Sequence, residues 1–306
     1  MTDSQHTDVA VIGGGPAGLQ AALTLGRIHR DVVLFDDGTY RNATVSHMHN
    51  VVALDGTPPA DFRADARRQL TAYDTVTVRE ERVETVDEVD GLFHLRTAGG
   101  TTLTATALIL ATGVRDTLPP VPGVDALWGD LVAHCPFCHG HELSGRRVGI
   151  LGVAIAPHLS GLLRRIASEI VVLTDGGPVP DGLPAGTSVR TERVLSVERH
   201  DGGVRVVLEG ADGERVPAAL SEQVAGLFVK PELSQSAPFA EQLGLELNPS
   251  GAVRVDEFAR SSRDRVLCAG DMAHLPAYPM PMASVVSAAA SGQLAASAAV
   301  MALTSH

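Results

Sequence analysis

The sequence is poor in cysteine and in basic side chains, and both shortages exclude functions. Three cysteines occur among 306 residues, too few for the disulfide framework that staples small secreted domains. Lysines and arginines number 24 against 36 aspartates and glutamates, which leaves a formal net charge of −12. Such a chain is a poor partner for nucleic acid or for an anionic membrane surface. We therefore expect small-molecule or protein partners, and neither nucleic acid nor membrane.

Signals for export and for membrane insertion are weak. The stretch MTDSQHTDVAVIGGG has no basic segment followed by an apolar core and a small-residue cleavage site, so we expect a cytoplasmic protein. Residues 282–303 are the most membrane-like, yet they are mainly alanine and serine and include Gln293. We interpret them as a closely packed, buried helix.

The first forty residues predict a β-α-β unit that binds a dinucleotide. A short apolar strand (8–14), a helical stretch (16–28) and a second strand (31–37) follow one another. The first turn carries G-x-G-x-x-G, whose glycines allow a tight turn, close approach to a pyrophosphate and close helix–strand contact. These glycines are Gly13, Gly15 and Gly18. Asp36, with Asp37 as the fallback, is placed to bind the adenosine ribose.

The rest of the chain predicts a second unit of the same kind. Short strands fill residues 76–113, and residues 146–173 read as strand, helix (about 157–167) and strand. A strand-rich stretch follows to residue 230. A chain of this length, 44% hydrophobic, can build two domains. We predict an α/β fold with two doubly wound, Rossmann-like nucleotide-binding domains, the second inserted into the first.

The stretch HCPFCHGHE, residues 134–142, concentrates sulfur and imidazole groups and leaves three interpretations open. Cys135, Cys138 and His139 spell the C-x-x-C-H of c-type haem attachment, which normally accompanies an export signal. A structural zinc site usually needs a second ligand pair, and Cys268 stands alone and reads as a core residue. The third interpretation, a redox-active disulfide, fits best.

An ordered set of motifs resembles the flavoprotein disulfide reductases. They are GGGPAG (13–18), ILATG (109–113) with PPVPG downstream, and CAGD (268–271). A CPFC pair in the middle of a short chain is similar to the thioredoxin reductase branch. The resemblance implies a discontinuous FAD-binding domain from 1–117 and 245–306, and a middle NAD(P)-binding-like domain at 118–244. It also implies a homodimer.

The resemblance carries cofactor-binding roles over to particular residues. The first turn would hold the pyrophosphate. Asn50 would lie near the isoalloxazine and Val83 near the adenine, and Gly270 and Asp271 would bind the ribityl chain. A helix starting near Ser284 would point its N-terminus at the flavin. The full set is Gly13, Gly15, Pro16, Ala17, Gly18, Asp36, Asn50, Val83, Gly113, Gly270, Asp271, Ser284 and Val285.

The resemblance also assigns the thiols. Cys138 would face the flavin and Cys135 would meet the substrate. Where thioredoxin reductases typically have an acid after the second cysteine, this chain has His139. That feature, with FDDGTYRN (35–42), resembles the dithiol oxidases that close the disulfides of gliotoxin and holomycin. His139, and His141 after it, are the predicted proton shuttles, because imidazole titrates near neutrality.

The second glycine-rich turn looks unfit for NADPH. It reads GVAIAP (152–157), with Ala154 and Pro157 at the second and third glycine positions. A methyl group at the second position obstructs a pyrophosphate. The next strand is followed by Asp175, with no basic residue before Arg190 to pair with a 2′-phosphate. We predict that the middle domain does not use nicotinamide.

These features favour a dithiol oxidase that passes electrons from a small-molecule dithiol through Cys135 and Cys138 to FAD and then to O2. One alternative is a thioredoxin reductase-type disulfide reductase fed by NADPH or by another donor such as ferredoxin, with a thioredoxin-like protein as partner. The other is a non-enzymatic flavin and thiol redox sensor. The sequence does not fix the substrate.

Overall fold

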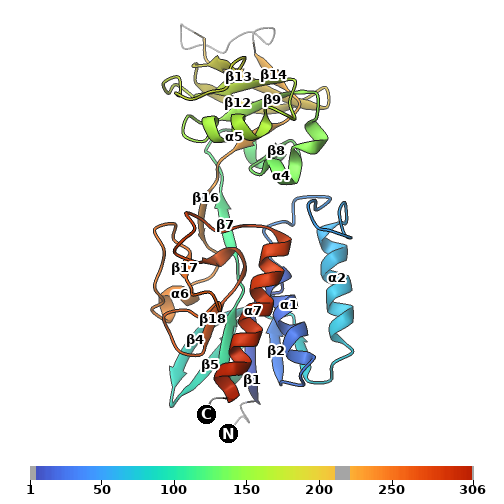
Figure 1. Ribbon diagram of the computed structural model, residues 1–306, viewed down its shortest axis with the longest axis vertical. Helices are drawn as coiled ribbons and strands as arrows, with labels where there is room; N and C mark the ends of the chain where they lie inside the picture. The colour runs from blue at the N-terminus through green and yellow to red at the C-terminus, as the bar shows by residue number, and fades with distance from the viewer. Residues whose placement is uncertain (1–4, 211–220, 305–306) are drawn as a thin grey trace. The chain divides into compact units, whose positions relative to one another are not determined.

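The computed structural model describes residues 5–210 and 221–304, which form two compact units (Figure 1). The first unit is Met1–Ala43, Pro59–Arg115 and Leu233–His306, and the second is Thr44–Pro58 and Asp116–Glu232. Each unit contains a parallel sheet, which confirms the predicted α/β class of nucleotide-binding fold. Part of the predicted strand-rich stretch, residues 211–220, lies outside the described residues.

The first unit is built on a seven-stranded sheet. Strands run in the order β3-β2-β1-β6-β5-β4, with β18 also paired to β6. β1 is parallel to β2 and β6, while β4, β5 and β6 are antiparallel neighbours. The bounds are β1 Gln5–Ile12, β2 Val32–Phe35, β3 Val76–Arg79, β4 Val83–Val89, β5 Leu92–Thr97, β6 Thr102–Leu110 and β18 Val266–Cys268.

Two hydrophobic cores cover the two faces of this sheet. Val9 and Val11 of β1 lie in one core, with helices α1 (Pro16–Gly26) and α7 (Val285–Thr304), whereas Ala10 and Ile12 lie in the other. Successive side chains of a strand point to opposite faces, so a strand buried on both faces is apolar throughout. Cys268 is buried in the second core, as its reading as a core residue predicted.

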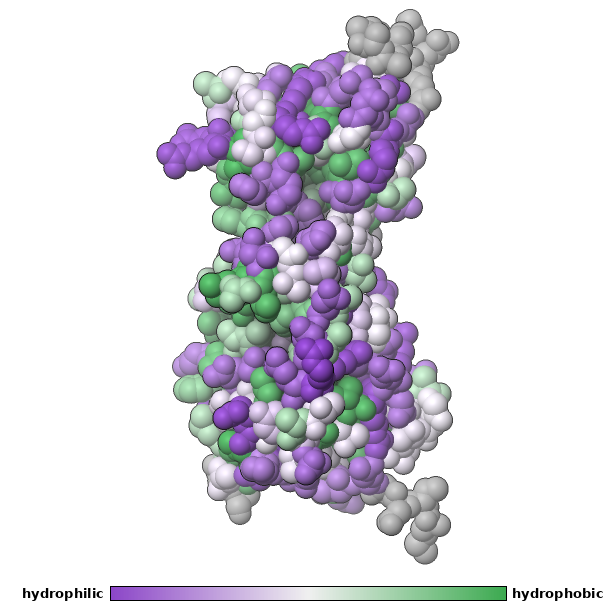
Figure 2. Space-filling view, turned by 90° about the vertical axis from the view of Figure 1, so that its right-hand side faces the viewer, coloured by the Kyte–Doolittle hydropathy of each residue, from purple (hydrophilic) through white to green (hydrophobic). Residues whose placement is uncertain are grey.

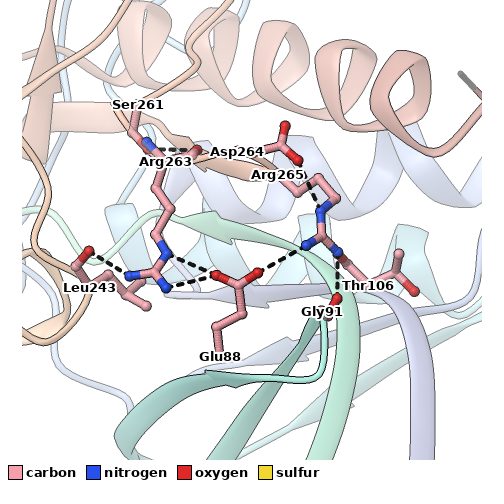
Figure 3. A network of polar contacts seen from close by, with 8 residues as sticks. All are labelled: Glu88, Gly91, Thr106, Leu243, Ser261, Arg263, Asp264 and Arg265. Atoms are coloured by element: carbon pink, nitrogen blue, oxygen red, sulfur yellow. Dashed lines mark hydrogen bonds and ion pairs between the residues drawn. The ribbon is translucent and has the colours of Figure 1, made fainter. Parts of the chain in front are cut away.

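A charge network joins β4 to Arg263 and Arg265, which precede β18, within this unit (Figure 3). Glu88, at the end of β4, accepts hydrogen bonds from Arg263 Nε at 2.9 Å and from an Arg265 guanidinium nitrogen at 3.0 Å. Arg265 also donates to the carbonyl oxygens of Gly91 at 2.7 Å and Thr106 at 2.9 Å. The C-terminal segment is therefore fixed to the β4–β6 part of the sheet by charge-assisted hydrogen bonds.

Helix α7 is the one helix among the described residues that is long and apolar enough to cross a membrane by length and composition. In this unit it packs against α1 through small residues. A Cβ atom on Gly292 would overlap the carbonyl oxygen of Ala17, so glycine lets the two helices approach closely. The close packing predicted for residues 282–303 is confirmed on this face, but the helix is not buried all round, because Val286, Leu294 and Met301 are each about half exposed.

The second unit contains a parallel sheet of order β11-β10-β9-β15-β8 and a separate antiparallel sheet β12-β13-β14. The predicted second β-α-β unit is β9, α5 and β10. Helix α5 ends at Leu163, earlier than predicted, and the Ile166 N–H then donates to the Leu163 carbonyl in a tighter, three-residue turn. The bounds are β8 Val132–Ala133, β9 Arg147–Leu151, α5 Ala156–Leu163, β10 Glu169–Leu173, β11 Ser188–Arg190, β12 Val194–His200, β13 Gly203–Leu208, β14 Glu222–Val224 and β15 Leu227–Val229.

The unit boundaries differ from the predicted 118 and 244. Strands β7 (Val114–Thr117) and β16 (Glu232–Gln235), which span the two cut points, pair with each other. Residues 233–244 belong to the first unit because Phe239 and Leu243, in and beside helix α6 (Phe239–Gln242), pack into its second core. Residues 44–58 group with the second unit.

The face of the molecule seen in Figure 2 is mostly polar. Figure 2 shows hydrophilic residues over much of the visible face, with hydrophobic residues in smaller patches among them. Several large apolar side chains are exposed all the same, including Phe137, which follows Cys135 and Pro136 in the CxxC motif. This phenylalanine is two-thirds exposed (67%), which leaves a bulky apolar group beside the thiols.

Candidate active site

The first glycine-rich turn is open at one position and crowded at two others. Gly13 has φ 118°, in the region that favours glycine, and a Cβ atom there would overlap the Ala111 carbonyl oxygen. A Cβ atom on Gly18 would overlap the carbonyl oxygen of Gly13, so this glycine permits close helix–strand contact. Gly15, by contrast, has nothing within 4 Å of its Cβ position. The turn therefore leaves space at the N-terminus of α1, where backbone N–H groups attract phosphate.

A fourth glycine, which sequence reasoning missed, makes room for the acid. A Cβ atom on Gly14 would overlap the carboxylate of Asp36, which is buried at the end of β2. That carboxylate accepts hydrogen bonds from Tyr40 Oη at 2.7 Å and from the Gly38 N–H at 3.0 Å. It also pairs with Arg67 of α2 (Pro59–Leu70). The charge of Asp36 is thus compensated, and its position is fixed.

The cluster around Asp36 also changes the pKa of Tyr40. Burial, together with the hydrogen bond to Asp36, raises the pKa of Tyr40 to about 12. Arg63 lies over the Tyr40 ring at 3.8 Å from its centroid and donates to Asn42 Oδ1 at 3.0 Å. The stretch FDDGTYRN is therefore an ordered polar segment beside the glycine-rich turn, fixed by Arg63 and Arg67 of α2.

The other predicted cofactor residues of the first unit lie on several elements. Asp271, in the short 3₁₀ helix Gly270–Met272, pairs with Arg41 at 2.9 Å. Helix α7 begins at Val285, and Ser284 caps it by accepting a hydrogen bond from the Ser287 N–H at 3.0 Å, which confirms the predicted helix start. Val83 is a buried core residue of β4, Gly113 has φ 68°, and Asn50 belongs to the second unit.

The thiols lie at the start of a short helix in the second unit. Cys135 is the N-cap of α4 (Pro136–His139), and its extended backbone turns into the helix at Pro136, a favoured first residue. Cys138 Sγ lies 2.6 Å from Cys135 Sγ. The N–H groups of Cys138 and His139 both donate to the Cys135 carbonyl at 3.1 Å. The CxxC geometry therefore brings the two sulfur atoms together, close to bonding distance.

His139 follows Cys138 and is largely buried. Burial lowers its pKa, and this change is partly opposed by the charge of Glu142 and by a hydrogen bond to the Gly129 backbone. The Nδ1 atom of His139 is buried and has no hydrogen-bond partner in the described part of the chain. A histidine with a lowered pKa is neutral at pH 7, so it is available to accept a proton.

The other histidines of the motif have different surroundings. His141 is exposed in the 3₁₀ helix His141–Leu143, and His134 stacks on Trp128 with ring centroids 5.6 Å apart. Among the described residues no group of three or more His, Cys, Asp or Glu side chains is arranged to hold a metal ion. Of the three histidines, His139 has the surroundings that best suit acid–base chemistry.

A cavity of about 230 Å³ in the second unit is lined by Cys138 and His139, and not by Cys135. Neither His49 nor Glu142 was a predicted site residue, yet both line this cavity. Glu142 ends the HCPFCHGHE stretch, whereas His49 comes from the separate segment 44–58, which no local pattern links to the thiols. The full lining is Val45, Ser46, His47, His49, Gly129, Asp130, Leu131, Ala133, Cys138, His139, Glu142, Leu143, Arg146, Ala225, Leu227 and Phe228.

The second glycine-rich turn begins with the same backbone conformation as the first, but its helix begins differently. Gly152 has φ 115°, close to that of Gly13. Helix α5, however, begins at Ala156, one residue later relative to this glycine than α1 does, with Ile155 as N-cap and Pro157 in its first turn. Proline has no N–H to offer a phosphate. The methyl group of Ala154 stands where Gly15 leaves open space.

The loop that follows β10 packs against the second glycine-rich turn. A Cβ atom on Gly177 would lie 2.8 Å from a methyl carbon of Val153, so the loop rests on the turn. Asp175 accepts a hydrogen bond from the Val194 N–H at 2.8 Å. No arginine or lysine precedes Arg190 in this region, and Arg190 pairs with Glu192 and Glu222.

The fold and the CxxC pair define an FAD-dependent disulfide oxidoreductase. The chain belongs to the pyridine nucleotide-disulphide oxidoreductase family, which matches residues 7–292. The crystal structure of an oxidoreductase from Agrobacterium tumefaciens superimposes with a TM-score of 0.85 at 34% identity, covering 98% of this chain and 99% of that chain. The residues of the first turn fit the cofactor, since the open Gly15 position and the start of α1 form a cradle that a Cβ atom would fill.

Two curated relatives carry the name thioredoxin reductase. Thioredoxin reductase tcpT of Claviceps purpurea is 33% identical over 292 residues, which cover 89% of this chain and 88% of the relative. Thioredoxin reductase sirT of Leptosphaeria maculans is 34% identical over 315 residues, covering 95% of this chain and 92% of the relative. The suspected membership of the thioredoxin reductase-like branch is confirmed.

Proposed function

We propose that this enzyme is a dithiol oxidase, which closes a disulfide in a small-molecule dithiol and passes two electrons through Cys135 and Cys138 to FAD and then to O2. The observation that carries this proposal is the altered turn of the second unit, with Ala154, Pro157 and the Val153–Gly177 contact where a nicotinamide site needs open backbone. A disulfide oxidoreductase without that site needs another electron donor, and a dithiol suits its CxxC pair.

The first unit would hold FAD. The start of α1 would bind the pyrophosphate through backbone N–H groups, Asp36 would accept hydrogen bonds from the ribose, and the N-terminus of α7 would stabilise negative charge. Asp271 would bind the ribityl chain, with Arg41 fixing its carboxylate at 2.9 Å. Bound FAD supplies an acceptor for the electron pair of the reduced thiols.

The second unit would carry out the thiol exchange. A substrate thiolate attacks Cys135 Sγ, the Cys135–Cys138 bond breaks, and Cys138 leaves as a thiolate. The second substrate thiol then attacks the mixed disulfide, which releases the oxidised product and the Cys135 thiolate. Two electrons have moved from the substrate to the cysteine pair. His139 accepts a proton from the attacking thiol, because its lowered pKa keeps it neutral, and His141 is the exposed alternative.

The proposal is tested by following oxygen uptake with dithiothreitol and dihydrolipoamide as dithiol probes. We expect one hydrogen peroxide for each disulfide formed, and no activity in Cys135→Ser protein. Turnover of NADPH with a disulfide at a comparable rate, without dithiol-dependent oxygen uptake, would instead identify a reductase.

We also propose that the protein is a homodimer. Val286, Leu294 and Met301 of α7 are each about half exposed, and their spacing of eight and seven residues lines them along one helix face. A second copy would cover this apolar stripe. Sedimentation of the holoenzyme should give twice the 31.9 kDa chain mass, and a single species at the chain mass would contradict the dimer.

A further inference from the structure

The cavity beside Cys138 contains an acid–base chain that the thiol–flavin scheme does not require. His49 lies between two carboxylates. Its Nδ1 atom is 3.4 Å from Asp55 Oδ2, and its Nε2 atom is 3.5 Å from Glu142 Oε1. Both nitrogen atoms of one ring therefore face acids, an arrangement in which the ring can receive a proton on one side and release it on the other.

The loop that carries His49 is held by its own hydrogen bonds. Asp55 Oδ1 accepts the Asn50 N–H at 2.6 Å, and Met48 and Thr57 pair through the Met48 N–H at 2.9 Å. Asn50 and Ala53 have φ 62° and 68°, which the loop imposes on residues other than glycine. His49 is thus placed by a tight loop, and Asp55 has the double role of fixing that loop and facing the imidazole.

Glu142 lies close to His49 and lines the same cavity as His139. Glu142 lies three residues after His139, in the 3₁₀ helix that follows α4 directly, and both side chains line the cavity with Cys138. His139 Nδ1 is buried without a hydrogen-bond partner in the described residues. The Glu142 side chain is about half exposed, so its charge is open to solvent.

We propose that Glu142 and His49 are positioning residues for His139, which act on it through the charged pair that they form in the cavity beside Cys138. The proposal deepens the proposed function and rests on it for the role of His139. A thiol loses one proton to His139, the resulting imidazolium releases that proton to solvent, and His139 returns to its neutral form. No electrons move in this proton transfer, so it balances with the exchange at the cysteines.

The charges of Glu142 and His49 have opposite effects on the pKa of His139. The Glu142 carboxylate raises the pKa of His139, whereas a charged His49 lowers it. A protonated His49 also pairs with Glu142 and reduces its influence. The other titratable or charged groups lining this cavity are His47, Asp130, Arg146 and Cys138. Among these, Asp130 adds a small upward effect on the His139 pKa.

The test is a histidine titration of the holoenzyme by ¹⁵N NMR, with His139 assigned through His139→Gln. In Glu142→Gln the pKa of His139 should fall, and in His49→Gln it should rise, each by a few tenths of a unit to about one unit, because partly exposed charges are screened. The acid limb of the pH profile of kcat/KM should move in the same directions. Asp201→Asn is the matched control, since it removes a carboxylate paired with a different histidine, His200, at 3.1 Å, and it should shift neither.

Opposite shifts in the two variants support the proposal, and a purely structural role for these residues does not produce them. Equal shifts, or no shift in either variant, would overturn it. If Glu142→Gln does not fold, Glu142→Asp keeps the charge and should leave the His139 pKa within the range of the unaltered protein. The NMR readout needs no turnover, so absent dithiol oxidation would refute the proposed function without deciding this inference.

Discussion

The two glycine-rich turns of this chain begin alike and end differently. Gly13 and Gly152 have φ 118° and 115°, so the two turns begin with the same backbone conformation after their first strand. In the first unit, Gly15 leaves open space and Pro16 starts the helix at once. In the second, the helix starts one residue later relative to its glycine and has Pro157 in its first turn.

The difference shows how one fold supports two tasks. A turn that keeps its glycines has an open backbone for a pyrophosphate, whereas the loop at Gly177 packs against Val153 of the altered turn. The second unit keeps the sheet of a nucleotide-binding domain and carries the thiol pair on α4 instead. Function follows the turn and the site rather than the fold.

The largest effect, a loss of FAD affinity, should come from filling the open space at Gly15. Gly15→Val places a side chain where the pyrophosphate would lie, and the empty surroundings of Gly15 predict that the apoprotein still folds. We expect FAD affinity to fall at least about a hundredfold, equivalent to ~3 kcal/mol, in a fluorescence titration. Ala154→Val is the matched change in the other turn and should leave FAD content unchanged. Full FAD occupancy in Gly15→Val protein would contradict the assignment of this turn.

The next effect separates the tasks of the two units. Cys138→Ser should retain FAD, because the thiols belong to the second unit, and should lose dithiol oxidation by about a thousandfold or more. Any charge-transfer band between thiolate and flavin should disappear in Cys138→Ser and grow in Cys135→Ser, measured by absorbance. The reverse pattern would exchange the proposed roles of the two sulfur atoms.

A smaller loss is expected for the proton acceptor. His139→Gln should lower kcat/KM by about a hundredfold, within the usual range for general acid–base groups. Burial lowers the pKa of His139, and the neutral ring is the active form. The rate should therefore rise with pH and reach half its limit below about pH 6.5, the ordinary value for histidine. An acid limb that persists unchanged in His139→Gln protein would assign it to another group.

The smallest effect is expected where glycines are restored to the second turn. The double change Ala154→Gly and Pro157→Gly removes two obstacles, but Val153 still contacts the Gly177 loop and no basic residue is added. NADPH binding, measured by calorimetry, should stay undetectable. Saturable NADPH binding in this variant would show that the two residues alone close the site.

Local sequence patterns predicted those features that depend on neighbouring residues. The β-α-β units and the pairing of Cys135 with Cys138 follow from spacing along one segment, whereas the helix start near Ser284 was implied by the family resemblance. Contacts between distant segments were not predictable, such as Arg67 with Asp36, or His49 with Glu142. The boundary at 244 failed for the same reason, since Phe239 packs into a core built from remote strands.

The central claim is that electrons enter from thiols rather than from nicotinamide, and anaerobic stopped-flow absorbance tests it most directly. Oxidised holoenzyme is mixed without oxygen with dithiothreitol in one experiment and with NADPH in another. The account predicts that the dithiol bleaches the flavin, that NADPH does not, and that added O2 restores the oxidised spectrum. Rapid bleaching by NADPH, with none by the dithiol, would contradict it.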